Sequence, residues 1–337
     1  MLVQVFLLAA LLAFPSYGLL AQVSSRASVY KIGVSRTTGT HAVGSAVLIA
    51  PGKLITNCHT VRDAKHIAII YPEGEIPVSL DQADFFHDLC VLGTRAFNGR
   101  PVTRVPSAEL AVGQPVVAVG YTPGFRLSVA RGSITALYPY DSGFVLRTSA
   151  WFPRGASGGG LFDEEGRLLG ILSFRGGSGD ELNYVLPNEW IDRILVEGPS
   201  NPASSSRSIA FWDDDAPQQP TFLRAASMEQ QGAWRELHVL ATDWLLSSED
   251  DVEAWIALGR ASAALGENKG AAVALRRAVA LQPNNRQAWY WLATAYHSIG
   301  YDRQSADAAA RLGELDTALA TRLRSSVGNG APLDSEE

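Results

Sequence analysis

Residue types that build metal and disulfide scaffolds are scarce in this sequence. The 337 residues include only two cysteines, Cys58 and Cys90, and six histidines. Two cysteines exclude a disulfide-dense scaffold and a four-cysteine zinc site, and without a C-x-x-C pair a thioredoxin-like motif is excluded as well. No spacing of His, Asp and Glu favours a metal site, so we expect neither a metal nor a cofactor. The two cysteines fit a disulfide and a pair of small buried thiols equally well.

Positive charge is also in short supply. The chain has 28 Lys and Arg against 34 Asp and Glu, a formal net charge of −6. Without a basic excess, the overall field does not attract nucleic acid or anionic lipid, and we expect no nucleic-acid partner. The acidic excess lies in residues 199–337, since residues 23–198 hold 16 residues of each sign. Glycine is concentrated in the earlier part and alanine in the later one, which predicts a turn-rich β domain followed by a helical domain.

Long apolar runs are missing except at the amino end. Residues 1–22 carry no charged side chain, and a stretch of 14 residues, apolar except for Gln4, gives way to Pro15. This stretch is short for a membrane span and predicts a cleaved secretory signal. Because no Lys or Arg lies near Met1, a membrane anchor formed by residues 1–22 is the alternative. We expect an exported, periplasmic or secreted protein with no stable membrane span after removal of the signal.

Residues 28 to about 197 consist of short apolar runs separated by Gly, Pro, Asn and Asp. Runs of four to eight residues rich in Val, Ile and Leu, with turn residues between them, predict an all-β sandwich or barrel. Five of the runs are residues 43–50, 66–71, 116–120, 143–147 and 168–174. Residues 199–220, rich in Pro, Ser and Asp, predict a linker, in which we expect the pair Phe211 and Trp212 to dock on a neighbouring domain.

The chain from residue 221 onward has a helical pattern that repeats. Trp255 and Trp289 are 34 residues apart, and each begins the series of aromatic and small residues typical of a tetratricopeptide repeat. We assign residues 221–325 to an all-α tetratricopeptide-repeat domain, with a looser first unit, and residues 326–337 to a disordered tail. Each repeat buries its face against a neighbour, and the concave surface of such a stack is expected to bind a partner protein or peptide. An ordinary helical bundle is the alternative.

Three segments of the β domain, residues 44–61, 85–92 and 154–173, each contain one group needed for acyl transfer. Ser157 lies in a glycine cluster that allows a tight turn, exposes the hydroxyl and aims peptide N–H groups at one point. The N–H groups of Gly155 and Ser157 are therefore candidates for an oxyanion hole.

A serine hydroxyl is a weak nucleophile and needs an imidazole nearby to take its proton. His59 is the candidate base, and Asp88 is the candidate for holding its other ring nitrogen. Asp84 is the competitor of Asp88 for this role. We favour Asp88, because the run Asp-Leu-Cys-Val-Leu places it at the start of a strand.

The order of these groups along the chain separates two hydrolase folds. The pattern Gly-x-Ser-x-Gly also marks the α/β-hydrolase turn, where the acid and the histidine follow the serine. After Ser157 the only histidines are His238 and His297, both within the helical repeats. A histidine and then an aspartate precede the serine, which is the order of the chymotrypsin-like enzymes. A β-barrel peptidase is therefore favoured.

Residues 28–195 resemble the trypsin-like peptidase domain, particularly its HtrA (Deg) branch. The segments that carry the resemblance are residues 44–49, 54–59, 88–92, 116–124, 131–137 and 148–161. The resemblance covers about half of the chain. It implies two packed six-stranded β-barrels over residues 26–198, with the catalytic triad in the cleft between them.

The same resemblance implies roles for five further residues in substrate binding. Ser173 corresponds to the serine that starts the substrate-pairing strand, and Phe174 and Arg175 would line this strand, which holds an extended peptide by β-augmentation. Trp151 and Leu182 would lie around the primary side-chain pocket. Since neither is acidic, we expect an apolar residue of small or medium size in this pocket, not Lys or Arg.

Two residues near Ser157 depart from the family pattern. Ala156 replaces the aspartate that cleavage-activated members use to bind a new N-terminus, and Gly160 stands where proline is usual. No PDZ-like pattern follows the peptidase domain, and the helical repeats take its place.

The sequence thus predicts an exported serine endopeptidase that cleaves polypeptides through an acyl-enzyme, fused to a partner-binding helical array. The alternatives are an inactive adaptor or chaperone that keeps the peptide cleft, and an esterase that uses the same triad.

Overall fold

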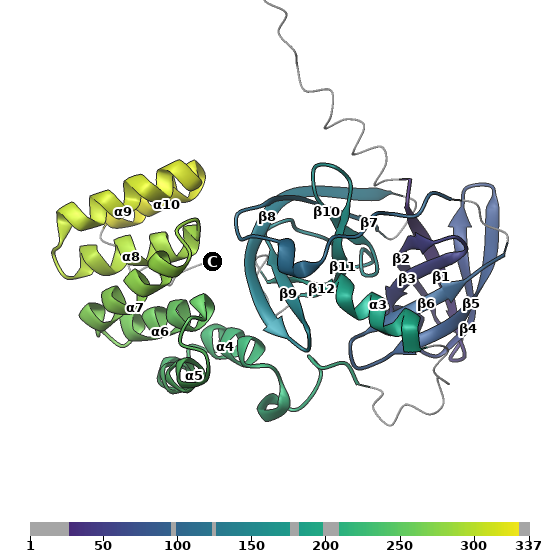
Figure 1. Cartoon of the computed structure of the whole chain (residues 1–337), viewed down its shortest axis with the longest axis horizontal. Helices are drawn as coiled ribbons and strands as arrows, with labels where there is room; N and C mark the ends of the chain where they lie inside the picture. Colours follow the sequence, from purple (N-terminus) through teal and green to yellow (C-terminus); the bar gives the residue numbers. More distant parts are fainter. Residues whose placement is uncertain (1–26, 96–98, 123–125, 176–181, 198–208, 330–337) are drawn as a thin grey trace, which may run out of the picture.

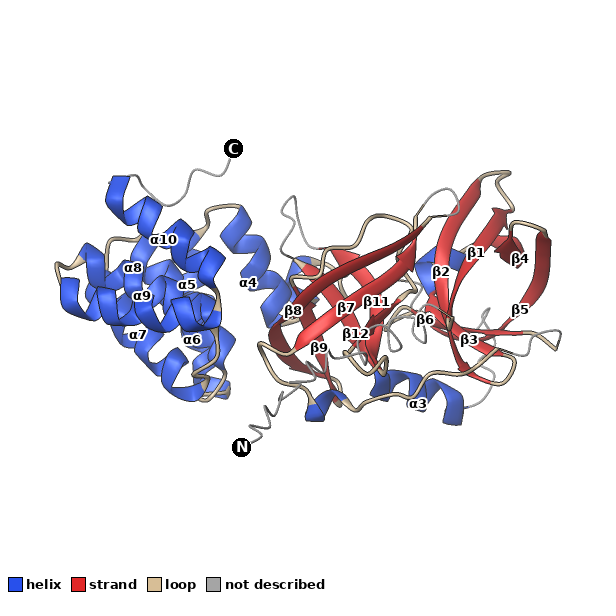
Figure 2. Ribbon diagram, turned by 90° about the horizontal axis from the view of Figure 1, so that it is seen from above, coloured by secondary structure: helices blue, strands red, loops and turns tan. Residues whose placement is uncertain are grey.

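Two β-barrels and a helical array make up the protein, whose computed structural model is shown in two views (Figure 1, Figure 2). The structure describes residues 27–95, 99–122, 126–175, 182–197 and 209–329. The predicted signal segment, residues 1–22, therefore lies outside the described residues. Among the helices of the described ranges, none combines the length and the apolarity that a membrane crossing requires.

Each barrel is a closed sheet of six antiparallel strands. The first has the order β1-β2-β3-β6-β5-β4, and the second has the order β10-β11-β12-β9-β8-β7. The first contains β1 (Val29–Arg36), β2 (His41–Ala50), β3 (Lys53–Asn57), β4 (Ala64–Tyr71), β5 (Gly74–Asp84) and β6 (Leu89–Gly93). The second contains β7 (Pro115–Tyr121), β8 (Leu127–Tyr140), β9 (Gly143–Thr148), β10 (Gly160–Phe162), β11 (Leu168–Arg175) and β12 (Asn183–Pro187). The predicted double-barrel architecture is confirmed, and each of the five apolar runs lies in a strand.

Adjacent residues of the barrel strands are buried in different apolar cores, because side chains alternate across a strand. In β3, Leu54 packs in a core made only of first-barrel residues, whereas Ile55 packs in a core that both barrels share. In β11, Leu172 belongs to a core of the second barrel, and Ile171 to the shared one. Burial on both faces explains why these strands are almost continuously apolar in sequence. The shared core sets the two barrels against each other.

The remaining elements of the peptidase half are short. They are α2 (Cys58–Val61), α3 (Asn188–Glu197) and the 3₁₀ turn η1 (Ser107–Glu109). Cys58, at the start of α2, forms a disulfide with Cys90 of β6, with their Cα atoms 5.0 Å apart. The disulfide thus ties the short helix that carries His59 to the strand that follows Asp88.

Helices in antiparallel pairs form the C-terminal half, after the 3₁₀ turn η2 (Ala216–Gln218). They are α4 (Thr221–Gln230), α5 (Trp234–Ser247), α6 (Val252–Ala264), α7 (Asn268–Leu281), α8 (Arg286–Ser298), α9 (Asp302–Leu315) and α10 (Thr317–Asn329). The predicted repeats are α6 with α7 and α8 with α9, and the looser first unit is α4 with α5. Helix α10 includes the first four residues of the predicted tail, 326–329, and residues 330–337 lie outside the described residues.

The repeat is visible in local contacts as well as in the helix boundaries. Asp251 caps α6 by accepting the backbone N–H groups of Glu253 and Ala254, and Asn285 caps α8 by accepting that of Ala288. A Cβ atom at Gly259 of α6 would lie 2.5 Å from the side chain of Leu275 in α7. The two helices therefore pack at a distance that only glycine allows at this position.

The helical array contacts the second barrel through the layer formed by α4, α6 and α8. The ring of Phe222 stacks on Tyr138 of β8, with centroids 4.3 Å apart. The guanidinium of Arg147 in β9 lies 3.4 Å from a carboxylate oxygen of Glu253 and donates to the side-chain oxygen of Gln287 at 3.2 Å. Side-chain exposure is only 11% for Arg147 and 10% for Glu253.

The two acceptors that the helical array offers to Arg147 occupy equivalent positions of successive repeats. Glu253 and Gln287 are 34 residues apart, the same spacing as Trp255 and Trp289. Burial raises the pKa of the Glu253 carboxyl above its usual range, although the charge of Arg147 opposes this shift. The guanidinium therefore compensates a carboxylate that would otherwise be costly to bury.

We predict that Arg147→Met destabilises the full chain by about 3 kcal/mol at neutral pH, because it leaves the Glu253 carboxylate buried without its cation. A carboxyl with a raised folded-state pKa contributes stability that is lost as pH rises through that pKa. The loss of Tm, measured by thermal denaturation, should therefore be larger at pH 8 than at pH 5. The matched control, Arg147→Met with Glu253→Gln, should show the same Tm loss at both pH values. An equal loss in the single variant would contradict the prediction.

We predict that Cys58→Ser with Cys90→Ser lowers the free energy of unfolding by about 3–4 kcal/mol, because the disulfide closes a loop between residues 32 apart. Chemical denaturation of the oxidised wild type and of the double variant measures this difference. Thiol titration of denatured, unreduced protein should detect no free thiol, and detection of two would contradict the pairing.

Candidate active site

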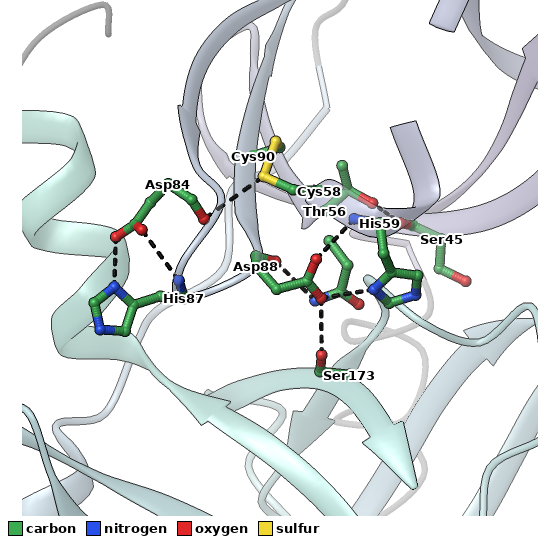
Figure 3. Close-up of a disulfide and its surroundings, with 10 residues drawn as sticks. Ser45, Thr56, Cys58, His59, Asp84, His87, Asp88, Cys90 and Ser173 are labelled. Carbon is green, nitrogen blue, oxygen red and sulfur yellow. Dashed lines mark hydrogen bonds and ion pairs between the residues drawn. A yellow bond between two sulfur atoms is a disulfide. The ribbon is translucent and has the colours of Figure 1, made fainter. Parts of the chain in front are cut away.

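His59 is held by Asp88 through two contacts (Figure 3). The backbone N–H of His59 donates to one carboxylate oxygen of Asp88 at 2.7 Å, and ring atom Nδ1 lies 2.7 Å from the other. The imidazole is 39% exposed, whereas the carboxylate is 1% exposed. These contacts fix the ring orientation and leave Nε2 outside the pairing with Asp88.

The backbone at Asp88 is unusual. Its φ is +55°, a left-handed conformation that aspartate adopts more readily than most other non-glycine residues. The carbonyl of Asp88 accepts hydrogen bonds from the side chain of Asn57 and from the N–H of Cys58, both at 3.1 Å. These bonds from the end of β3 and the start of α2 stabilise the turn that points the carboxylate at His59.

The alternative acid, Asp84, belongs to a second His–Asp pair. One of its carboxylate oxygens lies 2.7 Å from Nδ1 of His87, and the other accepts the His87 N–H at 3.1 Å (Figure 3). Burial alone would raise the pKa of Asp84, but the hydrogen bonds and charge of His87, together with Arg193, lower it overall. The other ring nitrogen of His87 lies 2.8 Å from Asp141, in the turn between β8 and β9. Asp84 therefore serves a buried contact between the barrels, and Asp88 is the partner of His59.

Ser157 is connected to the His59–Asp88 pair by hydrogen bonds of Ser173 in β11. The hydroxyl of Ser157 donates to the backbone carbonyl of Ser173 at 3.1 Å. The hydroxyl of Ser173 donates to the Asp88 oxygen that faces the His59 ring, at 3.0 Å (Figure 3). Ser173 thus links the Ser157 hydroxyl to the carboxylate that holds the His59 ring.

The turn that carries Ser157 requires its glycines. Gly155 has φ +93° and Gly158 has φ +82°, both in the region that favours glycine. A Cβ atom at Gly158 would lie 2.1 Å from the carbonyl oxygen of Ser45. Within the described ranges, the N–H groups of Gly155 and Ser157 donate to no acceptor. Both are therefore free to bind a developing negative charge.

Two polar residues of the first barrel hold this turn, and sequence reasoning did not give them a role. The hydroxyl of Ser45 donates to the carbonyl of Gly155 at 3.1 Å and accepts the N–H of Tyr121 at 2.8 Å. Thr56 donates to the carbonyl of Ser45 at 2.7 Å. Ser45 and Thr56 lie in segments that carry the family resemblance, but nothing in their spacing distinguishes them from neighbouring strand residues.

Strand β11 extends beyond the end of its pairing with β10, so one of its edges is unpaired there in the described part of the chain. Strand β10 pairs with β11 only as far as Ile171, while β12 pairs with the opposite edge up to Arg175. Among the described residues, no strand pairs with residues 173–175 on the edge facing Ser157. This edge can accept an extended peptide.

The predicted substrate-binding side chains have different environments. Ser173 is buried and binds Asp88, whereas Phe174 is half-buried between two aromatic rings. Leu182 packs partly buried against the core shared by the barrels, and Trp151 is 42% exposed. The side chain of Arg175 lies outside the described residues. In the described part of the chain, no three His, Cys, Asp or Glu side chains cluster in a way that could hold a metal ion.

Comparisons with known proteins find similarity in two parts of the chain. Residues 44–171 match a family model described as a trypsin-like peptidase domain, and residues 259–300 match one described as a TPR repeat. The serine endoprotease DegS of Haemophilus influenzae is 28% identical over 204 residues, which are 53% of this chain and 60% of DegS. A probable periplasmic serine endoprotease, DegP-like, of Ectopseudomonas mendocina is 35% identical over 159 residues, 44% of this chain and 33% of the relative.

A solved structure of the HtrA-type protease AlgW with a tripeptide matches with a TM-score of 0.50 and 25% identity, over 54% of this chain and 63% of AlgW. The chain therefore spans less than two thirds of the length of each of these relatives. The peptidase match covers residues 44–171 of the two barrels, and the TPR match covers residues 259–300 of the helical array, in the order that the sequence predicts. The chain thus contains a segment that matches a trypsin-like peptidase domain and is similar to HtrA-type proteases, followed by a segment that matches a TPR repeat.

Proposed function

We propose that this chain is a serine endopeptidase that cleaves polypeptides with Ser157 as nucleophile, His59 as general base and Asp88 as the residue that orients the base. The observation that carries the proposal is the pair of hydrogen bonds at Ser173, one from the Ser157 hydroxyl and one to the Asp88 carboxylate. They bring the nucleophile and the His–Asp pair from different barrels to one place.

The reaction proceeds in two acyl-transfer steps. The Ser157 hydroxyl, which donates to the Ser173 carbonyl in this structure, rotates about its Cα–Cβ bond toward Nε2 of His59. As its oxygen attacks the substrate carbonyl, His59 takes the proton and then delivers it to the leaving amine. A water molecule, deprotonated by His59, releases the acyl group from Ser157. Asp88 stabilises the imidazolium in both steps.

The oxyanion of each tetrahedral intermediate is bound by the N–H groups of Gly155 and Ser157. Their orientation depends on the positive φ of Gly155 and on the hydrogen bond from Ser45 to the Gly155 carbonyl. Because Ala156 replaces the aspartate that binds a new N-terminus in cleavage-activated members, activation by that salt bridge is not available to this turn.

The substrate binds as an extended strand along residues 173–175 of β11. Backbone hydrogen bonds along this open edge position the scissile carbonyl beside Ser157. We assign Trp151 and Leu182 to the surroundings of the primary side-chain pocket, which takes an apolar residue of small or medium size. Both of these side chains are uncharged, so neither provides an ion-pair partner for Lys or Arg.

We further propose that the protein is exported, with residues 1–22 as the signal. The match to a relative described as periplasmic and the Cys58–Cys90 disulfide support this location, because disulfides persist in oxidising compartments.

The helical array is proposed to bind a partner protein or peptide on the layer formed by α4, α6 and α8. On this layer, Arg260 of α6 pairs with Glu229 of α4 at 2.8 Å, and its guanidinium lies 4.7 Å from the ring centroid of Trp291 in α8. The end of the layer near Arg147 already binds the peptidase domain, so the partner occupies the part beyond it.

The test compares the wild type with Ser157→Ala in the full chain. Wild type should react with a fluorophosphonate probe and cleave members of a peptide library, whereas Ser157→Ala should do neither, because the acyl-enzyme cannot form. Peptide binding without labelling or cleavage would contradict the proposal in favour of an adaptor. Fast turnover of small esters with no peptide cleavage would contradict it in favour of an esterase.

The two His–Asp pairs provide a matched comparison for the role of Asp88. We predict that Asp88→Asn lowers kcat by about 10⁴-fold, because the amide no longer favours the imidazole tautomer that can accept the Ser157 proton. Asp84→Asn, which removes the acid from the other pair, should keep kcat within about threefold, although it lowers Tm because the buried His87 loses a hydrogen-bond partner. Steady-state kinetics and thermal denaturation of both variants measure these effects. A large loss of kcat in Asp84→Asn alone would reverse the assignment.

A further inference from the structure

Residues 210–212, in the described part of the segment between the two domains, pack on the peptidase barrels. Phe211 is 1% exposed, and its backbone N–H donates to the carbonyl of Phe86 at 3.0 Å. Its ring packs among the rings of Tyr140 and Trp190, with centroids 5.0 Å and 5.8 Å away. The predicted docking of the Phe211–Trp212 pair is therefore confirmed, and the contact surface is aromatic.

Trp212 is the outermost of three stacked rings. It lies against one face of Phe174, with centroids 4.2 Å apart and planes 20° apart. Tyr184 of β12 covers the other face of Phe174, with centroids 4.7 Å apart and planes 15° apart. Because both faces of the Phe174 ring are covered, Phe174 cannot stack on a further ring. The half-buried Trp212 is the ring at the end of the stack that remains partly accessible.

This stack is built on residues next in sequence to those of the proposed reaction centre. Phe174 follows Ser173, the residue that binds both Ser157 and Asp88. Phe86, which anchors the neighbouring Phe211, precedes Asp88 by two residues. The segment therefore bridges both sides of the site, the first barrel through Phe86 and the second through Phe174.

Hydrogen bonds fix the backbone around Trp212. The side chain of Gln219 donates to the carbonyl of Trp212 at 2.7 Å and to that of Asp214 at 3.0 Å. The N–H of Asp213 donates to the carbonyl of Ala210 at 2.8 Å, which closes the turn. A wall held in this way is formed before a ligand arrives, so binding against it has little ordering cost.

We infer that Trp212 is a specificity-determining residue that selects a large apolar or aromatic side chain of the substrate, where the extended peptide passes Phe174. The inference rests on the substrate strand assigned above, since Phe174 lies on that strand. A flat, half-exposed indole favours an apolar or aromatic side chain over a polar one by stacking and by burial of apolar area. The selecting residue lies outside the barrels, in the segment that leads to the helical array.

The test measures binding as well as cleavage. Full-length Ser157→Ala is presented with a positional-scanning library of acetylated hexapeptides, each with one fixed residue, and dissociation constants are compared for Phe, Leu and Trp against Gln and Ser at each position. At one position, the apolar residues should bind about tenfold more tightly. Adding Trp212→Ala should abolish this preference, Trp212→Phe should retain part of it, and the control Tyr301→Ala, an exposed aromatic of the array, should leave it unchanged.

An apolar preference that persists in Trp212→Ala, or the absence of any such preference in Ser157→Ala, would overturn the inference. If the peptidase proposal is wrong, the result is different: fluorophosphonate does not label the wild type. In chains with Ser157 intact, Trp212→Ala should raise KM for the apolar substrate with kcat within about twofold, whereas misfolding would lower labelling of Ser157 as well. Trp212→Phe provides the comparison if the alanine variant does not fold.

Discussion

The carboxylate of Asp88 accepts hydrogen bonds from both barrels, and the arrangement of the candidate site depends on these bonds. His59 donates from the first barrel through its backbone and lies against the carboxylate through its ring, and Ser173 donates from the second. A nearly unexposed carboxylate needs such donors, because burying a charge without them is costly. The core shared by the two barrels aligns the donors of one barrel with those of the other. The packing of apolar residues in β3 and β11 therefore determines the position of the polar groups.

The architecture and the main residues of the candidate site could be predicted from the sequence, because both depend on local patterns. Short apolar runs, a tryptophan period of 34 residues and the order His, Asp, Ser are properties of the chain itself. The choice between Asp84 and Asp88 was harder, since each lies close to a histidine once the chain folds. It depends on the left-handed turn at Asp88 and on a separate pairing of Asp84 with His87.

Contacts between distant segments were the part that the sequence could not specify. Ser45 joins β2 to the Gly155 turn, 110 residues away, and no periodicity marks such a hydroxyl. The docking of Phe211 and Trp212 was predictable from two large aromatic rings in a polar segment, but the identity of the rings that receive them was not. Arg147 could not be recognised either, because its partners Glu253 and Gln287 follow more than a hundred residues later.

The contact of Arg147 with two successive repeats also provides a path by which a force on the helical array reaches the second barrel. Phe222 rests on β8, and Glu253 with Gln287 holds β9, so the array is attached to the second barrel at two neighbouring strands as well as by the covalent chain. A load applied to the helices by a bound partner enters the peptidase half through these strands. Strand β9 ends at Thr148, nine residues before Ser157, so the strand that bears this load leads along the chain to the turn that carries the proposed nucleophile.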